Sequence, residues 1–384
     1  MIDPVALAQD LIRCPSVTPA DAGALDVVSR ALAGLGFDVH RLDFDGTPNV
    51  FARRGSTGPH LCFAGHTDVV PPGAAAWSID PFGGEIRGGV LYGRGACDMK
   101  GAVAAFIAAV SAEPPSGASV SLLITGDEEG PATGGTVRVL EWMAEHGHIP
   151  DFCLVGEPTN PARLGDVVKV GRRGSLNARI TVEGIQGHVA YPARVDNPVH
   201  RLTRVLADLL AAPLDAGTDW FEPSSLQVTS VDVGNAATNI VPASVTAQLN
   251  IRFNDRHTGA SLEQFLRGVL ARHADRATLD ARLSGEAFLT APGPHTDRLC
   301  AAIASVTGVQ PRLDTGGGTS DARFIARHCP VAEFGLVGST MHMADENVPV
   351  ADLVCLTTIY RAVLRAFLPQ APESRSVSSV SVAA

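Results

Sequence analysis

The chain has 384 residues, 45% of them hydrophobic, so it is long enough for two domains with buried cores. Its formal net charge of −10 argues against nucleic acid as the main partner. No segment approaches the roughly 20 apolar residues that a membrane-spanning helix needs, and the N-terminus lacks the basic and apolar regions of a signal peptide. Seven cysteines without a close pair favour a reducing compartment, so we expect a cytoplasmic protein with no membrane partner.

The first 173 residues alternate between predicted helices and strands. Asp3 and Pro4 are typical of a helix N-cap and first turn, and apolar residues recur at helical spacing from Leu25 until Gly36. Strands are predicted near residues 37–44, 49–53, 61–64, 119–125 and 152–155, and further helices near 100–112 and 135–146. This alternation predicts an α/β domain in which helices flank a largely parallel, mixed sheet.

The pattern changes after residue 173. Strands are predicted at 176–182, 226–231, 245–253 and 278–283, and helices at 198–210 and 261–273. The order β-α-β-β-α-β predicts a ferredoxin-like α+β domain, which we place at 174–286, inserted into the first domain. Residues 287–368 return to the α/β pattern and complete the first domain. We expect the tail 369–384, rich in Ser, Pro, Ala and Val, to be disordered.

Three predicted strands end in a glycine followed by acidic or imidazole side chains. The segments are Gly65-His66-Thr67-Asp68, Gly126-Asp127-Glu128-Glu129 and Gly156-Glu157. In open α/β sheets, ligands and reaction centres collect beyond the carboxyl ends of the strands. Unpaired charges beside a core are costly, and a bound cation offsets that cost. The sequence therefore predicts a metal site at this edge of the sheet.

Two further candidate ligands come from other parts of the chain. Asp98 opens the helix at 100–112, and His342 follows the apolar segment 331–337, which we predict to be a strand. Taken singly, Asp98 could be an ordinary N-cap and His342 a surface loop residue. Taken together, the candidates suit two divalent ions that share a carboxylate: His66, Asp98, Glu129, Glu157 and His342. Nitrogen and oxygen ligands without thiolate favour Zn²⁺, Co²⁺ or Mn²⁺.

Two residue pairs near these candidates suggest a division of labour. Glu128 and Glu129 are neighbours whose side chains diverge, so one carboxylate would bind metal while the other accepts a proton from water. His66 and Asp68 are two residues apart, so one of them can bind metal while the other supports it. Cys97, beside Asp98, is expected to be a small packed side chain and not a ligand.

These motifs resemble those of the M20 metallopeptidases, a family of dizinc aminoacylases and carboxypeptidases. The resemblance rests on residues 65–71, 95–101, 127–130 and 156–158 and spans residues 3–365. More narrowly, residues 171–176, 184–192, 196–198 and 316–324 are similar to the family's desuccinylase branch, which acts on N-succinyl-L,L-2,6-diaminopimelate in lysine and meso-diaminopimelate biosynthesis. The alternatives are another M20 deacylase, such as an acetylornithine deacetylase or a dipeptidase, and a binding protein without activity. Retention of Glu128 disfavours the last.

The resemblance implies a role for each candidate ligand. Asp98, followed by a cis peptide, would bridge two zinc ions, with cobalt as the other candidate metal. His66 and Glu157 would hold one ion, and Glu129 and His342 would hold the other. The inserted domain would serve as a lid and as the contact of a homodimer.

Three further residues receive catalytic roles from the same resemblance. Asp68 would orient His66, and Glu128 would be the general base. His188, on the inserted domain, would stabilise the oxyanion in the site of the neighbouring subunit. Without the resemblance, His188 is equally well a polar residue in a turn flanked by glycine.

The implied substrate carries several carboxylates, so an acidic protein needs a local positive pocket to bind it. Arg172 and Arg252 are the candidates, because a guanidinium matches a carboxylate with two hydrogen bonds; either could also be an ordinary surface residue. Neutral donors expected in the same pocket are Ser175, Tyr191, Asn239 and Thr319. One departure from the family is Gly338, which stands where an asparagine is common, so one substrate hydrogen bond is missing or supplied elsewhere.

Overall fold

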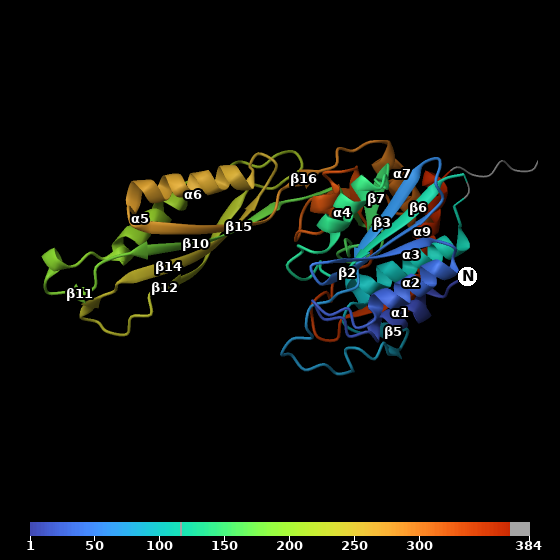
Figure 1. Cartoon of the computed structure of the whole chain (residues 1–384), viewed down its shortest axis with the longest axis horizontal. Helices are drawn as coiled ribbons and strands as arrows, with labels where there is room; N and C mark the ends of the chain where they lie inside the picture. Colours follow the sequence, from blue (N-terminus) through green and yellow to red (C-terminus); the bar gives the residue numbers. More distant parts are fainter. Residues whose placement is uncertain (116, 369–384) are drawn as a thin grey trace, which may run out of the picture. The chain divides into compact units, whose positions relative to one another are not determined.

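The computed structural model describes residues 1–115 and 117–368, and the chain packs into two units (Figure 1). The first unit comprises Met1–Val168, Pro292–Arg312 and the described residues from His328 onward, and the second comprises Lys169–Ala291 and Leu313–Arg327. The tail that we expect to be disordered, 369–384, lies outside the described residues. The domain boundaries proposed at 174 and 286 stay a prediction.

An eight-stranded sheet forms the core of the first unit, in the order β1-β2-β6-β3-β7-β18-β8-β17. The pairs β6–β3, β3–β7 and β7–β18 are parallel, whereas β1–β2 and β2–β6 are antiparallel. The predicted mixed, mostly parallel sheet is therefore confirmed. The strands are β1 (Asp38–Phe44), β2 (Thr47–Arg54), β3 (His60–His66), β6 (Ser119–Thr125), β7 (Phe152–Val155), β8 (Val167–Lys169), β17 (Arg312–Asp314) and β18 (Val331–Glu333).

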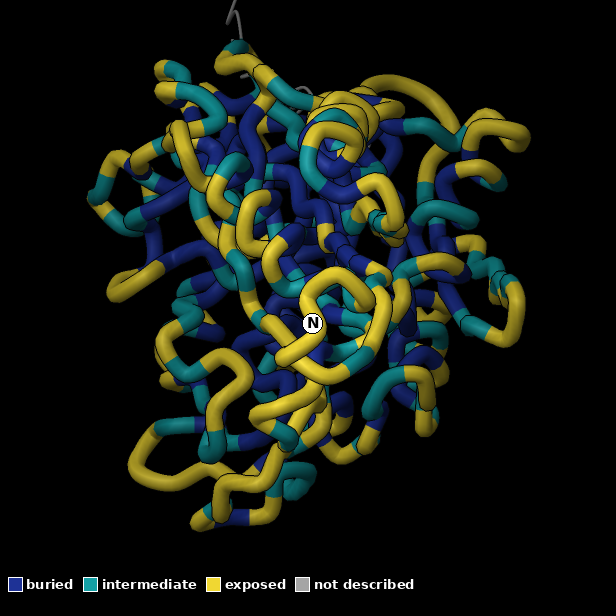
Figure 2. Tube along the Cα trace, turned by 90° about the vertical axis from the view of Figure 1, so that its left-hand side faces the viewer, coloured by how far each residue is buried: buried dark blue, intermediate teal, exposed yellow. Residues whose placement is uncertain are grey.

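Helices cover this sheet, and β3 and β6 are buried at every position. Figure 2 shows buried segments, in dark blue, lying mostly inside the exposed ones, in yellow. α3 (Gly101–Ala112) packs against β3, α1 (Pro4–Ile12) and α9 (Val350–Phe367), and α9 packs against α7 (Pro294–Thr307). α2 (Ala24–Gly34) and α4 (Thr136–Glu145) contact β2. The alanine-rich α3 is buried almost all round, as expected for a helix enclosed in a core. No helix in the described ranges combines the length and apolar character needed to cross a membrane.

The second unit holds a four-stranded antiparallel sheet in the order β12-β14-β10-β15, with two helices packed on it. The chain order β10-α5-β12-β14-α6-β15 is the β-α-β-β-α-β order that the sequence predicts. Buried positions alternate along β14, and they form a core with α5 and α6. The bounds are β10 (Gly174–Glu183), α5 (Pro198–Leu209), β12 (Ser225–Asp232), β14 (Ser244–Phe253), α6 (Gly259–His273) and β15 (Ala277–Gly285).

Shorter elements complete both units. β19 (Asn347–Pro349), β5 (Val90–Tyr92) and β4 (Ile86–Arg87) form a three-stranded sheet. Two further pairs are β11 (Gly187–His188) with β13 (Ile240–Val241), and β9 (Gly171–Arg172) with β16 (Phe288–Leu289). The remaining turns of helix are η1 (Ala96–Lys100), η2 (Pro192–Arg194) and α8 (Ala322–Ile325).

One strand is shorter than the sequence predicts. The apolar segment 331–337 suggests a single strand, but β18 ends at Glu333. Its partner β7 ends at Val155, whose carbonyl accepts a bond from the Phe334 N–H at 2.9 Å. The run next pairs at an isolated parallel bridge between Val337 and Asn160, so the ladder is interrupted and the prediction of one continuous strand was wrong.

Candidate metal centre

The ends of β3, β6 and β7 bring predicted ligands to one edge of the first unit's sheet. His66 is the last residue of β3, and Glu157 follows the end of β7. The strands are parallel and in register, with His66 beside Thr125 of β6 and Ala64 beside Val155 of β7. The turn after β6 carries the two neighbouring glutamates. All these side chains come from one sheet edge, as their position after the apolar runs predicts.

Glycines before the ligands allow close packing beneath this edge. Met99, fully buried in η1, lies against the ends of both β3 and β7. A Cβ atom on Gly65 would lie 2.4 Å from the Met99 Cε atom, and one on Gly156 would lie 2.7 Å from it. The peptide bond between Asp98 and Met99 is cis, as the family resemblance implies. Glycine at these positions therefore lets the strand ends approach the segment that carries Asp98.

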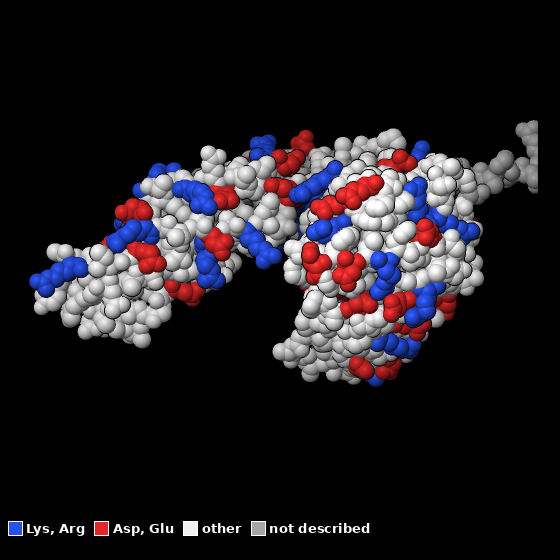
Figure 3. Space-filling model, viewed as in Figure 1, with Lys and Arg blue, Asp and Glu red and all other residues white. Residues whose placement is uncertain are grey.

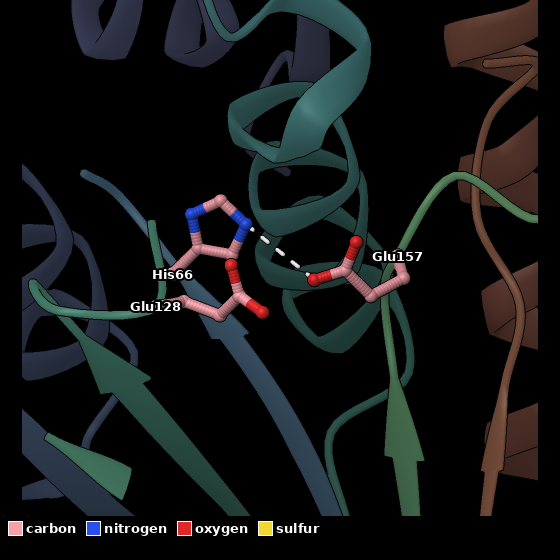
Figure 4. A group of neighbouring side chains, drawn as sticks. All are labelled: His66, Glu128 and Glu157. Carbon is pink, nitrogen blue, oxygen red and sulfur yellow. Dashed lines mark ion pairs between the residues drawn. The ribbon is translucent and has the colours of Figure 1, made fainter. Parts of the chain in front are cut away.

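Asp98 lies between the two histidines. Its Oδ1 is 3.3 Å from His66 Nε2, and its Oδ2 is 3.3 Å from His342 Nε2. His66 Nε2 also lies 3.5 Å from Glu157 Oε1 (Figure 4), and His342 Nε2 lies 2.9 Å from Glu129 Oε1. Each histidine thus meets one oxygen of Asp98 and one further carboxylate. This arrangement provides two ligand sets that share a carboxylate.

The two neighbouring glutamates lie on different sides of the site. Glu128 points toward His66 and Glu157 (Figure 4), and one ligand atom from each of these three residues lies within 4.8 Å of the others. Glu129 instead forms such a group with His66 and Asp98, and it also contacts His342. The divergence expected from their adjacency is therefore present.

Asp68 contacts both His66 and the turn that follows β6. Its two carboxylate oxygens accept the backbone N–H groups of Glu128 at 3.2 Å and Glu129 at 3.0 Å. His66 Nδ1 donates to the backbone carbonyl of Asp68 at 2.9 Å, whereas the Asp68 carboxylate lies 3.6 Å away. With Nδ1 engaged in this bond, Nε2 is the nitrogen that faces Asp98 and that would bind a metal after losing its proton.

The pKa values at the site follow from burial and from these contacts. Burial lowers the pKa of His66, but hydrogen bonds with Asp98 and Glu157 outweigh it and hold that pKa well above the usual value. Hydrogen bonds with Asp98 and Glu129 raise the pKa of His342 to about 10. Burial raises the pKa of Glu157 to about 7. Protons on the imidazoles would thus offset the buried negative charge wherever a cation does not.

The donor set fits divalent cations. The histidines and carboxylates supply nitrogen and oxygen, the ligand types that zinc, cobalt and manganese accept. The nearest thiol, Cys97, is fully buried. Burial, then the charges of Glu346 and Asp98, raise the pKa of Cys97 well above its usual value. Its sulfur contacts Glu346 Oε1 at 3.4 Å and Thr340 Oγ1 at 4.0 Å, neither of which belongs to the predicted ligand set.

Predicted substrate residues of the second unit fall into two groups. At the end where β9 pairs with β16, Arg172 Nη1 donates to the carbonyl oxygens of Gly318 at 3.0 Å and Gly316 at 3.5 Å, in the loop that carries Thr319. Ser175 lies opposite Arg252 in the β10–β14 ladder. This end therefore gathers Arg172, Ser175, Arg252 and Thr319.

The other group lies at the opposite end of this unit, at β11 (Figure 1). His188 pairs with Ile240, and the ring of Tyr191 lies 5.7 Å from that of His188. The backbone carbonyl of Asn239 accepts the N–H of Val189 at 3.1 Å. The length of β10 separates the two groups by roughly 26 Å. The single pocket expected from the sequence is therefore not assembled from both groups of one chain.

Two charged residues next to the metal centre were missed by the sequence analysis. Arg94 and Glu346 form a fully buried ion pair. The signal available was modest: an arginine between two glycines, in a segment that also carries Asp98, and a glutamate shortly after His342. Nothing in local spacing connects residues so far apart in the chain.

Comparison with known proteins gives consistent matches. Residues 62–366 match the sequence pattern of peptidase family M20/M25/M40. The chain is 67% identical to a succinyl-diaminopimelate desuccinylase of Gluconacetobacter diazotrophicus, over 94% of this chain and 96% of that protein. It is 61% identical to a succinyl-diaminopimelate desuccinylase of Acidiphilium cryptum, over 94% of this chain and 98% of that protein.

Solved structures agree on the fold. The M20 family metallo-carboxypeptidase Sso-CP2 of Sulfolobus solfataricus matches with a TM-score of 0.79 and 16% identity, covering 96% of this chain and 99% of that one. YXEP of Bacillus subtilis, a dinuclear metal-binding peptidase of the M20 family, matches with a TM-score of 0.69 and 15% identity, covering 94% and 96%. At these identities the structural matches show the shared fold alone.

We predict that metal binds more tightly as the pH rises from 6 to 9. Ligands must lose their protons to bind metal, and the raised pKa values of Glu157, about 7, and His342, about 10, mean that protons compete throughout this range. Competition titrations with a chelator should show affinity rising up to about tenfold per pH unit for each proton displaced. His342→Ala removes the imidazole whose pKa is about 10, so the dependence of metal affinity on pH should become shallower. Affinity independent of pH would contradict this ligand assignment.

Proposed function

We propose, because this chain belongs to peptidase family M20/M25/M40, that it hydrolyses N-succinyl-L,L-2,6-diaminopimelate to succinate and L,L-2,6-diaminopimelate, in lysine and meso-diaminopimelate biosynthesis. The observation that carries this proposal is the identity of 67% and 61% with two succinyl-diaminopimelate desuccinylases over nearly the whole chain. Dipeptidases of known structure match at 18–19% identity, which shows a shared fold alone.

In this proposal two divalent ions bind on either side of Asp98. Zinc is the first choice and cobalt the second. His66 and Glu157 would hold one ion, Glu129 and His342 would hold the other, and Asp98 would serve both. The support is the placement of the two Asp98 oxygens, each 3.3 Å from a different histidine. When bound, the ions would polarise the amide carbonyl and make water a better nucleophile.

Glu128 is the proposed general base. It takes the proton of the attacking water and then delivers it to the leaving amine. Glu128 belongs to neither of the two ligand sets proposed around Asp98. The Asp68 carboxylate accepts the backbone N–H of Glu128, and the Glu128 side chain faces His66 and Glu157. That position also allows Glu128 to act as a ligand, so metal content must be measured together with rate.

The substrate's carboxylates are proposed to bind at Arg172 and Arg252. Arg252 makes no ion pair with the described residues, and burial, then the charge of neighbouring Arg173, lowers its pKa. An anionic group would offset these adjacent positive charges. Ser175 and Thr319 supply neutral hydrogen-bonding groups at the same end. Thr319 Oγ1 is buried and without a hydrogen-bond partner among the described residues.

We infer a homodimer in which His188, with Tyr191 and Asn239, acts in the site of the neighbouring chain. A separation of roughly 26 Å along β10 keeps His188 away from the Arg172 end of its own unit, and a second chain removes that restriction. The sheet of the second unit ends in β12 and β15, which leave edges that a symmetric partner can cover.

A cytoplasmic location without nucleic-acid or membrane partners completes the proposal. Basic and acidic side chains are interspersed on the face shown in Figure 3, in a chain whose net charge is −10. Such a mixture does not provide the concentrated positive charge that phosphate backbones attract. All seven cysteines are free thiols, as expected in a reducing compartment.

Glu128→Gln should abolish turnover while metal content stays near two ions per chain. A general base contributes about 10²–10⁴-fold in rate, and the amide keeps the shape while losing the basicity. Metal analysis and kinetics on one sample check this. Glu129→Gln is the matched control and should lose metal as well as rate. Near-normal turnover, or loss of metal from Glu128→Gln, would show that Glu128 has another role.

Mixed dimers should test the role of His188 in the neighbouring site. His188→Ala and Glu128→Gln chains should each be inactive alone, yet regain activity when their subunits exchange, because one site per mixed dimer then has both groups. Activity is measured after exchange has been verified by mass spectrometry of differently tagged chains. Absence of recovery in verified mixed dimers would refute action in the neighbouring site.

A substrate panel tests the proposed function most directly. Metal-loaded protein should hydrolyse the succinylated substrate at least about 10–100-fold faster, in kcat/KM, than its N-acetyl analogue or N-acetylornithine. The lost charge-assisted hydrogen bonds cost about 1.5–3 kcal/mol, and about 1.36 kcal/mol is a factor of ten. Arg172→Ala and Arg252→Ala should lower kcat/KM for the succinylated compound, whereas exposed Arg179→Ala should not. Equal rates for acetylated and succinylated compounds would leave only a general deacylase function.

A further inference from the structure

Arg94 and Glu346 form an ion pair that is enclosed by the first unit. The residues are 252 positions apart in the chain, and Arg94 Nη1 donates to Glu346 Oε2 at 2.6 Å. Their side chains are only 1% and 0% exposed. Removing both charges from water is costly, and apolar residues often replace such a pair without loss of stability. Stability alone therefore does not explain this ion pair.

The second oxygen of Glu346 holds the segment that carries the shared carboxylate. Its Oε1 accepts the backbone N–H groups of Cys97 at 3.1 Å and Asp98 at 3.3 Å, and the Cys97 thiol lies 3.4 Å away. These bonds act on the main chain of Asp98, whose side-chain oxygens face His66 and His342. A carboxylate that accepts several N–H groups fixes their position strongly, because each is a charge-assisted hydrogen bond.

Arg94 extends the same connection to the His342 segment. Its Nη2 lies 3.4 Å from the carbonyl oxygen of His342 and at the same distance from those of Pro71 and Pro72. The guanidinium carbon is 5.2 Å from the centre of the Trp77 ring. The planar fork of arginine can serve Glu346 and these carbonyls together, which the single ammonium of lysine cannot do in the same geometry.

His342 has few other constraints. Its side chain is 44% exposed, and its backbone has φ of 62°, a left-handed conformation that is uncommon outside glycine. Close packing therefore does not hold this imidazole in place. The contact of its carbonyl with Arg94 links it to Glu346 and so to Asp98.

We propose that Arg94 and Glu346 are positioning residues that set the spacing between Asp98 and His342, and so tune the ion bound on the His342 side. The assignment of an ion to the His342 side rests on the proposed function. Neither residue has a role in substrate contact. Outer partners of metal ligands typically contribute about 10–100-fold to metal affinity or activity, which sets the size of the effect expected here.

The fold should tolerate changes to this pair. Backbone bonds join the same segments independently of the side chains: the Gly93 N–H donates to the Glu346 carbonyl at 2.9 Å, and Asn347 of β19 pairs with Tyr92 of β5. Glu346→Gln keeps the shape of the side chain, but its NH2 group must face another donor. That donor is either Arg94 or the backbone N–H groups of Cys97 and Asp98. Arg94→Lys keeps the charge but loses the fork.

The test is a competition titration with a chromophoric chelator and Zn²⁺ that resolves two stepwise dissociation constants. Glu346→Gln and Arg94→Lys should each raise one constant about 10–100-fold and change the other by less than about threefold. In a His342→Ala background, where one site remains, Glu346→Gln should then have less than a threefold effect. Glu113→Gln, which breaks a more exposed ion pair with Arg361, is the control and should change neither constant.

Other outcomes would overturn the proposal. Unchanged dissociation constants with a lower melting temperature would make the pair purely structural, and equal losses at both sites would remove the link to His342. If Glu346→Gln does not fold, Arg94→Lys decides; if neither variant folds without metal, the pair is structural and the proposal fails. Because metal affinity is measured without substrate, wild-type protein that binds two ions but fails to cleave the succinylated compound would refute the proposed function alone.

Discussion

The position of Asp98 between His66 and His342 is the contact on which the rest of the site depends. One carboxylate faces two imidazoles, and each imidazole meets a second carboxylate. Such a concentration of buried negative charge is unfavourable without cations. When no cation is bound, protons on the histidines would offset part of it. Divalent ions would offset it more fully, with ligand atoms already close to the places that they need.

The fold provides this contact through ordinary features of a parallel sheet. β3, β6 and β7 end in register, so the residues after them share an edge. Glycines at the strand ends let Met99 pack beneath, and this places Asp98 opposite His66. Asp68 then fixes the turn after β6 through two backbone bonds. The site is therefore held both by the register of the strands and by side chains, such as the Asp68 carboxylate, that bind the main chain around it.

Sequence reasoning predicted features that depend on neighbours in the chain. β6 and β7 lie at the predicted residues, because each is an apolar run followed by glycine. It was wrong about the length of β18, which depends on where β7 ends. Asp68 was expected to orient His66, and that role stays a prediction; which atom of Asp68 lies closest to His66, its backbone carbonyl, is a detail of turn geometry that the sequence does not reveal. The pair Arg94–Glu346 joins residues 252 positions apart, and no local pattern reveals it.

The most direct test of the two-ion centre is diffraction from crystals soaked in Zn²⁺, with anomalous data collected at the zinc edge. Two peaks are predicted, one bound by His66, Asp98 and Glu157, and the other by Asp98, Glu129 and His342. Both peaks should contact Asp98, one through each oxygen. A single peak at full zinc saturation, or two peaks of which neither touches Asp98, would contradict the account.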